Sequence, residues 1–357
     1  MRYLHLFEND ESFNNYVNNN YEEPFVSATN TGNDTYRVDY NQETIDYRTI
    51  PLTFEIISGG TIVWAANGSG VETKTIEYKK NDGQWTSITS VTGNGATISV
   101  DAGDIVQFRG NNATYANAAT KYNTFGTSTA IFNVYGNIMS LINSSTFQNS
   151  FAFETSFTFA GLFLNCSGII DAKNFILPAT ALTESCYYKF FQNCTNLVIA
   201  PSLPSTTLYT KCYINMFYGC ASLTTAPELP ATTLAERCYY CMFEGCTSLA
   251  TAPELPATTL TNYCYFSMFK DCTSLITAPE LSATTLLPYC YQNMLRNCTS
   301  LNYIKCLATD ISATSCTNNW VTDVQTTSGT FVKSTSMNDW TTGINGIPEN
   351  WTVQDAS

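Results

Sequence analysis

A 26-residue period dominates the second half of the chain and limits what it can fold into. Cysteines recur at this step in two series: Cys186, Cys212, Cys238, Cys264, Cys290 and Cys316, and Cys194, Cys220, Cys246, Cys272 and Cys298. Tyrosine, leucine and proline columns keep the same register. A compact globule has no reason to repeat in this way, whereas repeats that stack and share one core do.

One repeat shows the local pattern. Leu234, Cys238 and Met242 recur at every fourth position, which is typical of an apolar stripe on a helix. Thr233 and Glu236 match a capping box at its start. A proline-containing break follows before the next repeat. Each unit therefore predicts a short helix, a turn, a short strand and a turn, and because one unit buries too little surface alone, the units should stack as a solenoid.

The residues 242–249, Met-Phe-Glu-Gly-Cys-Thr-Ser-Leu, and 268–275, Met-Phe-Lys-Asp-Cys-Thr-Ser-Leu, carry a family resemblance. This pattern resembles the BspA-type leucine-rich repeats of gut and oral bacteria and their phages, over roughly residues 160 to 320. The resemblance implies a cysteine-containing leucine-rich-repeat solenoid used for surface adhesion and protein binding. It names no catalytic residue.

The remaining segments differ in character, and together they predict an α+β multidomain chain. Short β-branched or aromatic runs separated by Gly and Asn-Asp-Gly turns lie at 52–64, 75–78, 85–88, 97–100 and 105–108. Such spacing predicts an all-β, immunoglobulin-like sandwich. We expect four parts: an N-terminal docking segment at 1–48, a sandwich spacer at 49–135, the leucine-rich-repeat solenoid with its N-terminal cap at 136–325, and a C-terminal cap at 326–357.

The first 45 residues are polar and poor in aliphatic side chains, so alone they would not fold stably. The stretch containing Tyr21, Pro24, Phe25 and Val26, followed by Tyr40, resembles the N-terminal segments of virion proteins from Bacteroides-infecting, crAss-like phages. That resemblance implies docking onto other virion proteins, of capsid or collar. The start of the chain also shows no apolar run of signal-peptide length, which favours assembly in a host cytoplasm over secretion.

Charge and composition narrow the function further. The chain has 16 basic and 29 acidic residues, a net charge of -13, which repels phosphate backbones and anionic lipid. We therefore expect neither a nucleic-acid nor a membrane partner. There is one histidine, so a histidine triad or a multi-histidine metal site is not expected. No cofactor and no enzymatic activity are predicted.

The repeated polar and sulfur-containing columns are the candidate sites. The two cysteine series are expected to be buried, reduced thiols, because the C-x7-C spacing fits no zinc knuckle and cytoplasmic synthesis disfavours disulfides. Glu228, Glu254 and Glu280 form a column that is a candidate calcium site, although solvated glutamates are favoured because calcium needs six or more converging oxygens.

Aromatic and threonine columns are the candidate ligand surface. The column Tyr187, Tyr213, Tyr239, Tyr265 and Tyr291 is expected to pack in the core or at its edge. Tyr188 and Tyr240, one position on, are better candidates for exposed, ligand-binding aromatics. A threonine stripe suited to weak multivalent hydrogen bonding comprises Thr206, Thr232, Thr258 and Thr284.

These observations predict a non-enzymatic phage virion protein on the particle surface, as a head fibre or capsid decoration. Its solenoid would bind host-surface or mucosal glycans or proteins through many weak contacts, in a chain that forms a homo-oligomer. Two alternatives are a tail-associated receptor-binding protein and a bacterial cell-surface adhesin of the BspA type.

Overall fold

The computed structural model describes residues 3–5, 25–30, 35–40, 45–325 and 327–356. The chain divides into two compact units, residues 1–46 and 47–357. In the first unit, β3 (Thr35–Tyr40) pairs antiparallel with both β1 (Tyr3–His5) and β2 (Phe25–Asn30). Among the proposed docking residues, Tyr21 and Pro24 lie outside the described residues. Phe25 and Val26 lie in β2, and Phe25 is opposite Tyr40 of β3.

The second unit opens with two β-sheets, in which six strands, β4 to β9, lie where the sequence runs predict them and four, β10 to β13, were not predicted. A six-stranded sheet has the order β13-β12-β4-β9-β6-β7, and a four-stranded sheet has the order β10-β11-β5-β8. The strands are β4 (Leu52–Ser58), β5 (Gly60–Asn67), β6 (Thr75–Lys80), β7 (Thr86–Thr89), β8 (Ala96–Val100), β9 (Ile105–Arg109), β10 (Ala116–Ala118), β11 (Lys121–Thr124), β12 (Ile131–Asn137) and β13 (Phe175–Ile176).

Aromatic side chains join these two sheets. Phe54 of β4 stacks on Phe132 of β12 at 4.3 Å and lies 5.1 Å from Phe125, which in turn lies 4.7 Å from Trp64 of β5. Phe163, beyond the sheets, lies 5.7 Å from Phe125. The core of the sheets therefore continues without a break into the core of the repeats.

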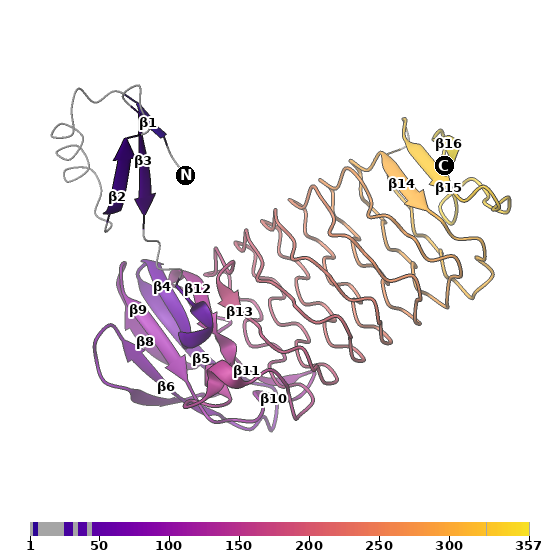
Figure 1. Cartoon of the computed structure of the whole chain (residues 1–357). Helices are drawn as coiled ribbons and strands as arrows, with labels where there is room; N and C mark the ends of the chain where they lie inside the picture. Colours follow the sequence, from indigo (N-terminus) through magenta and orange to yellow (C-terminus); the bar gives the residue numbers. More distant parts are fainter. Residues whose placement is uncertain (1–2, 6–24, 31–34, 41–44, 326, 357) are drawn as a thin grey trace. The chain divides into compact units, whose positions relative to one another are not determined.

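The 26-residue repeats wind as stacked coils that continue from the six-stranded sheet (Figure 1). Strand β12 pairs in parallel with β13, and Phe132 forms a parallel bridge with Ile169. The same kind of bridge joins later coils, at Ile199 with Thr225 and at Thr251 with Thr277. The β12-β13 side of the six-stranded sheet thus provides the first layer on which the coils stack.

The predicted short-helix, short-strand leucine-rich-repeat solenoid is wrong, and so is the α+β class. Across the described residues the regular helices are three 3-10 turns before the repeats: η1 (Tyr47–Thr49), η2 (Ile138–Leu141) and η3 (Phe147–Asn149). The segments expected to be helical are runs of turns at 184–193, 210–219, 236–245, 262–271 and 288–297. The fold is almost entirely β-strand and turn.

Hydrogen bonding explains why these segments are not helices. The N–H groups of Cys186, Tyr188 and Phe190 donate to the carbonyl three residues back, whereas those of Tyr187 and Lys189 donate to the next coil, at 3.1 and 2.9 Å. An α-helix would use every N–H within itself. Here alternate N–H groups remain free to join neighbouring coils, so the backbone itself holds the stack together.

Left-handed residues set the four-residue spacing that resembled a helix. Ser185, Lys189 and Asn193 all have φ between 56° and 59°, one in every four residues. An α-helix has about 3.6 residues per turn, so a strict step of four drifts about 40° around the helix at each step. The turn ribbon has no such drift, which is why its inward side chains keep that step from one end of the segment to the other.

The last coils end in a small parallel sheet. Strands β14 (Tyr303–Cys306), β15 (Thr330–Lys333) and β16 (Thr352–Asp355) pair side by side. Trp320 stacks on Trp340 at 5.5 Å and donates from Nε1 to the carbonyl of Gly346 at 2.8 Å. Ile347 and Trp351 are buried beside them. Segment 338–351 thereby covers the apolar end of the stack.

Candidate functional site

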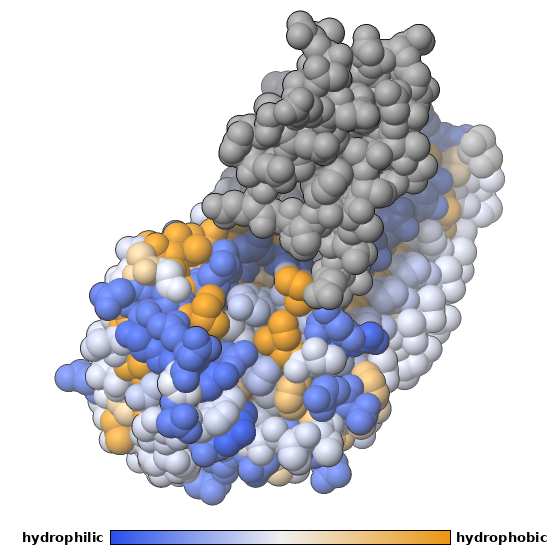
Figure 2. Space-filling view, turned by 60° about the vertical axis from the view of Figure 1, so that its left-hand side comes forward, coloured by the Kyte–Doolittle hydropathy of each residue, from blue (hydrophilic) through white to orange (hydrophobic). Residues whose placement is uncertain are grey.

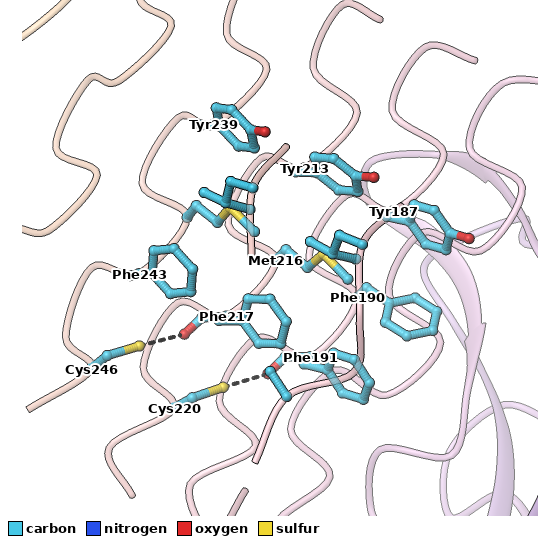
Figure 3. Close-up of a cluster of buried hydrophobic side chains, with 14 of the residues drawn as sticks. Tyr187, Phe190, Phe191, Tyr213, Met216, Phe217, Cys220, Tyr239, Phe243 and Cys246 are labelled. Carbon is cyan, nitrogen blue, oxygen red and sulfur yellow. Dashed lines mark hydrogen bonds between the residues drawn. The ribbon is translucent and has the colours of Figure 1, made fainter. Parts of the chain in front are cut away.

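The constant step of the repeat places most of its large side chains in the interior (Figure 3). The tyrosine column from Tyr187 to Tyr291 is buried, with successive rings stacked at 5.8, 5.9, 5.8 and 6.1 Å. Burial raises the pKa of Tyr213 well above its ordinary value. The hydroxyl of Tyr187 has no hydrogen-bond partner in the described structure. These rings stabilise the stack and are not available to a ligand.

The cysteines are equally enclosed. All 14 are free thiols and all are buried. In the Cys194 series each thiol donates to a phenylalanine carbonyl in the preceding coil, as Cys220 does to Phe191 at 3.1 Å and Cys246 to Phe217 at 3.2 Å (Figure 3). Burial raises the pKa of Cys246 well above its ordinary value. The series therefore acts as a line of small side chains that each bind the coil beneath.

The glutamate column does not converge on a cation. Among the described residues no group of three or more His, Cys, Asp or Glu side chains is placed to hold a metal ion. Glu280 instead pairs with Lys305 at 2.9 Å, whereas Glu228 and Glu254 are exposed and form no ion pair within the described part of the chain. The column is split between one neutralised carboxylate and two uncompensated ones.

The threonine column lies on the surface. Thr206, Thr232, Thr258 and Thr284 are all exposed, one on each of four successive coils. The backbone N–H of Thr232 donates to the carbonyl of Thr206 at 3.2 Å, which fixes the spacing between neighbours. Of the predicted ligand-binding residues, these four are the ones the fold brings together in a single exposed row.

The predicted aromatics lie elsewhere and are partly covered. Tyr188 is half-buried under Lys189, whose Nζ lies 5.1 Å from its ring. Tyr240 is half-buried and stacked on Phe266 at 4.5 Å, and burial raises its pKa. Phe266 occupies the position of Tyr240 in the next coil, and the sequence interpretation did not predict that the two rings stack.

A second outer stack was also missed. Tyr263 lies 4.5 Å from Tyr289 in parallel planes, and Arg237 covers its other face at 4.4 Å from the ring centre. Arg237, Tyr263 and Tyr289 occupy one repeat position, so the 26-residue register could have placed them together. Because both faces of Tyr263 are covered, that ring has only its edge and hydroxyl group left for other contacts.

Two slots open between coils at the proline-rich segments, which the sequence interpretation treated only as breaks. The first, of about 650 Å³, lies between residues 199–204 and 225–230, with Lys173 at its margin. The second, of about 450 Å³, lies between 226–230 and 253–256 and is lined by Glu228 and Glu254. The side of the coils that is visible in Figure 2 is mostly pale, which marks residues of intermediate hydropathy.

Comparison with known proteins identified no relative: no protein-family model, curated protein or solved structure matches this chain. None of the helices in the described residues is long and apolar enough to cross a membrane. The repeated surface and its slots are therefore the basis for a functional proposal.

Proposed function

We propose that this chain is a non-enzymatic adhesion protein displayed on a phage particle, as a head fibre or capsid decoration, and that its coil stack contacts host-surface or mucosal ligands. The observation that carries the proposal is the exposed row Thr206, Thr232, Thr258 and Thr284, in which the same group recurs on four successive coils. A row of identical weak contacts gains affinity by multiplicity, especially when the particle carries many copies.

The buried columns support the same role. Backbone hydrogen bonds join coil to coil, and stacked rings such as Phe217 on Phe243 at 5.6 Å fill the interior. A stack held in this way keeps its surface rows at a regular spacing without bound ligand. The separate N-terminal unit, residues 1–46, is the part that we assign to docking on the particle.

The contact surface can be tested with two variants matched in chemistry and coil. The first changes Thr232, Thr258 and Thr284 to alanine; the control changes Thr247, Thr273 and Thr299, which are exposed threonines at the same 26-residue step and line neither slot. Binding of the labelled chain to host cells and to mucin-coated surfaces is measured by fluorescence. We expect the first variant to lose most binding and the control to keep it. Equal binding by both would contradict the assignment of the surface.

The location is tested separately. Mass spectrometry and imaging of purified virions should find the chain on the head. Its presence on the tail would favour a receptor-binding protein, and its absence from particles, together with presence on bacterial envelopes, would favour the bacterial adhesin.

A further inference from the structure

Prolines create the slots between coils. Proline has no N–H and cannot donate a ladder hydrogen bond. Pro227 and Pro230 on one coil face Pro253 and Pro256 on the next, so the bonding that joins coils elsewhere stops here. The result is a gap with apolar walls at the surface.

The backbone between these prolines is also unpaired. The side chains of Leu203, Leu229 and Leu255 are buried, yet their N–H groups make no hydrogen bond to any described residue. The equivalent Leu281 differs, since its N–H donates to the carbonyl of Lys305 at 3.0 Å and its carbonyl accepts from Leu307 at 2.9 Å. Leu203 lines the first slot and Leu229 the second, so two successive coils present free donors at the slots. Leu255 lies between the slot-lining residues Glu254 and Pro256.

Charge distinguishes the second slot. Glu228 and Glu254 both line it, and neither has a basic partner among the described side chains. Their column neighbour Glu280, beyond the slots, is neutralised by Lys305. The slot therefore combines apolar ring walls, free backbone donors and two uncompensated carboxylates.

We propose that the slot between residues 226–230 and 253–256 binds an extended, basic polypeptide segment of the partner. This inference rests on the proposed adhesive function and gives its ligand a chemistry. The aliphatic stem of a lysine or arginine packs against the proline rings while its cationic head reaches Glu228 and Glu254. A carbonyl of the segment accepts from the free N–H group of Leu229, which lines the slot.

The neighbouring slot extends the same site. Side chains on one face of an extended chain recur at about 6.6 to 6.8 Å, every second residue. Rings in successive coils are 5.6 Å apart at Phe217 and Phe243. A second side chain of the same segment therefore reaches the slot lined by Pro201, Pro204 and Glu228. Lys173 at the margin of that slot disfavours a second lysine there, so the basic side chain belongs in the slot lined by Glu228 and Glu254.

The test uses the full chain and a synthetic octapeptide of alternating lysine and threonine, labelled at one end. Fluorescence anisotropy gives the affinity, and a glutamate-threonine octapeptide of the same length is the comparison. We expect the basic peptide alone to bind. The double variant E228Q/E254Q should weaken binding about two- to thirtyfold, the range for two exposed charge pairs. The matched control E280Q should bind like the unaltered chain, because Glu280 lies outside the slot.

Hydrogen exchange supplies an independent readout. Without peptide the amides of Leu229 and Leu255 should exchange rapidly. The basic peptide should protect segments 228–231 and 254–257, while exchange at Thr247, Thr273 and Thr299, which line neither slot, should not change. Equal binding of the acidic peptide, an unchanged affinity in E228Q/E254Q, or protection by a neutral oligosaccharide or by calcium chloride in place of the peptide would each overturn the proposal. If host-cell binding persists in E228Q/E254Q while the slots prove empty, this inference fails and the adhesive function stands.

Discussion

Alkaline pH should unfold this protein over a range in which most proteins of ordinary thiol content remain folded. Burial raises the pKa of five thiols to about 12, those of Cys166, Cys186, Cys238, Cys298 and Cys306, against an ordinary value of 9.0. A group whose pKa is higher in the folded state contributes its stabilisation fully below the unfolded pKa. That contribution is lost as the pH rises from about 9 toward 12, because only the unfolded thiol ionises there.

The size of the effect follows from linkage. At pH 10 an unfolded thiol lies one unit above its pKa of 9.0, so each of the five favours unfolding by about 1.4 kcal/mol. Together they remove about 7 kcal/mol, which is comparable with the whole stability of a typical protein, about 5 to 15 kcal/mol. Other buried thiols with raised pKa values, such as Cys212 and Cys246, add to this loss over the same range. The buried tyrosines, such as Tyr213, act in the same direction above pH 10.

The measurement is urea unfolding followed by tryptophan fluorescence at pH 7.5, 9 and 10, with reductant present throughout. The variant Cys238→Ala is compared with the unaltered chain at each pH. The cavity left by this substitution lowers the free energy of unfolding equally at every pH, so it does not affect the pH dependence. Between pH 7.5 and 10 the variant should lose about 1.4 kcal/mol less of its unfolding free energy than the unaltered chain loses. A total loss below about 2 kcal/mol in the unaltered chain would show that the thiols are not held protonated in the interior.

Three further predictions address the backbone and the core. Arg237 has a φ of 56°, so urea unfolding should show Arg237→Gly to be more stable than Arg237→Ala by about 0.5 to 1 kcal/mol. At the adjacent, exposed Glu236 the alanine variant should be more stable than the glycine variant. If alanine gives the more stable protein at both positions, the segment is a helix and the turn assignment is wrong. Gly136 has a φ of 82°, and a β-carbon there would lie 2.1 Å from the carbonyl oxygen of Pro51. Gly136→Ala should therefore lower the free energy of unfolding by more than about 2 kcal/mol. A thermal unfolding midpoint equal to that of the unaltered chain would contradict this packing. Phe217→Ala should lower the free energy of unfolding by about 3 to 5 kcal/mol, because its buried ring stacks between coils. Thr232→Ala, at an exposed position, should change it by less than about 0.5 kcal/mol. Similar losses in the two variants would refute the assignment of inner and outer columns.

The period alone predicted which side chains share a column, because any stack of equal coils places residues 26 apart beside one another. Hence Tyr213 and Tyr239 lie in contact, and so do Phe217 and Phe243, whatever the local backbone does. The short β-runs before residue 110 were equally readable, since alternation over four to eight residues is typical of a strand with one buried face. Those parts of the fold follow from spacing and hydrophobicity.

Local conformation was less accessible, because a four-residue ribbon and an α-helix both bring positions i and i+4 to one face. The available signal was the residue before the second cysteine series. Asn193, Gly219, Gly245, Asp271 and Asn297 fill it, and all have a φ between 59° and 76°. Gly, Asn and Asp are the residues that adopt this conformation at least cost. A column restricted to them marks a left-handed position, which a helix interior does not contain.

Proline was visible in the sequence, but its consequence depends on what lies across from it. A single proline removes one backbone N–H donor from its coil. Prolines at the same position in consecutive coils remove the N–H donors of both neighbouring segments, so hydrogen bonding between the two coils is interrupted there. Pro230 and Pro256 are therefore more than breaks between elements, because Leu229 and Leu255 directly before them have free N–H groups. Leu281 precedes Ser282 instead and is paired, although Pro279 continues the other proline column. In a repeat protein, a recurring proline thus predicts a row of slots, and Leu281, paired with Lys305, marks where the row ends.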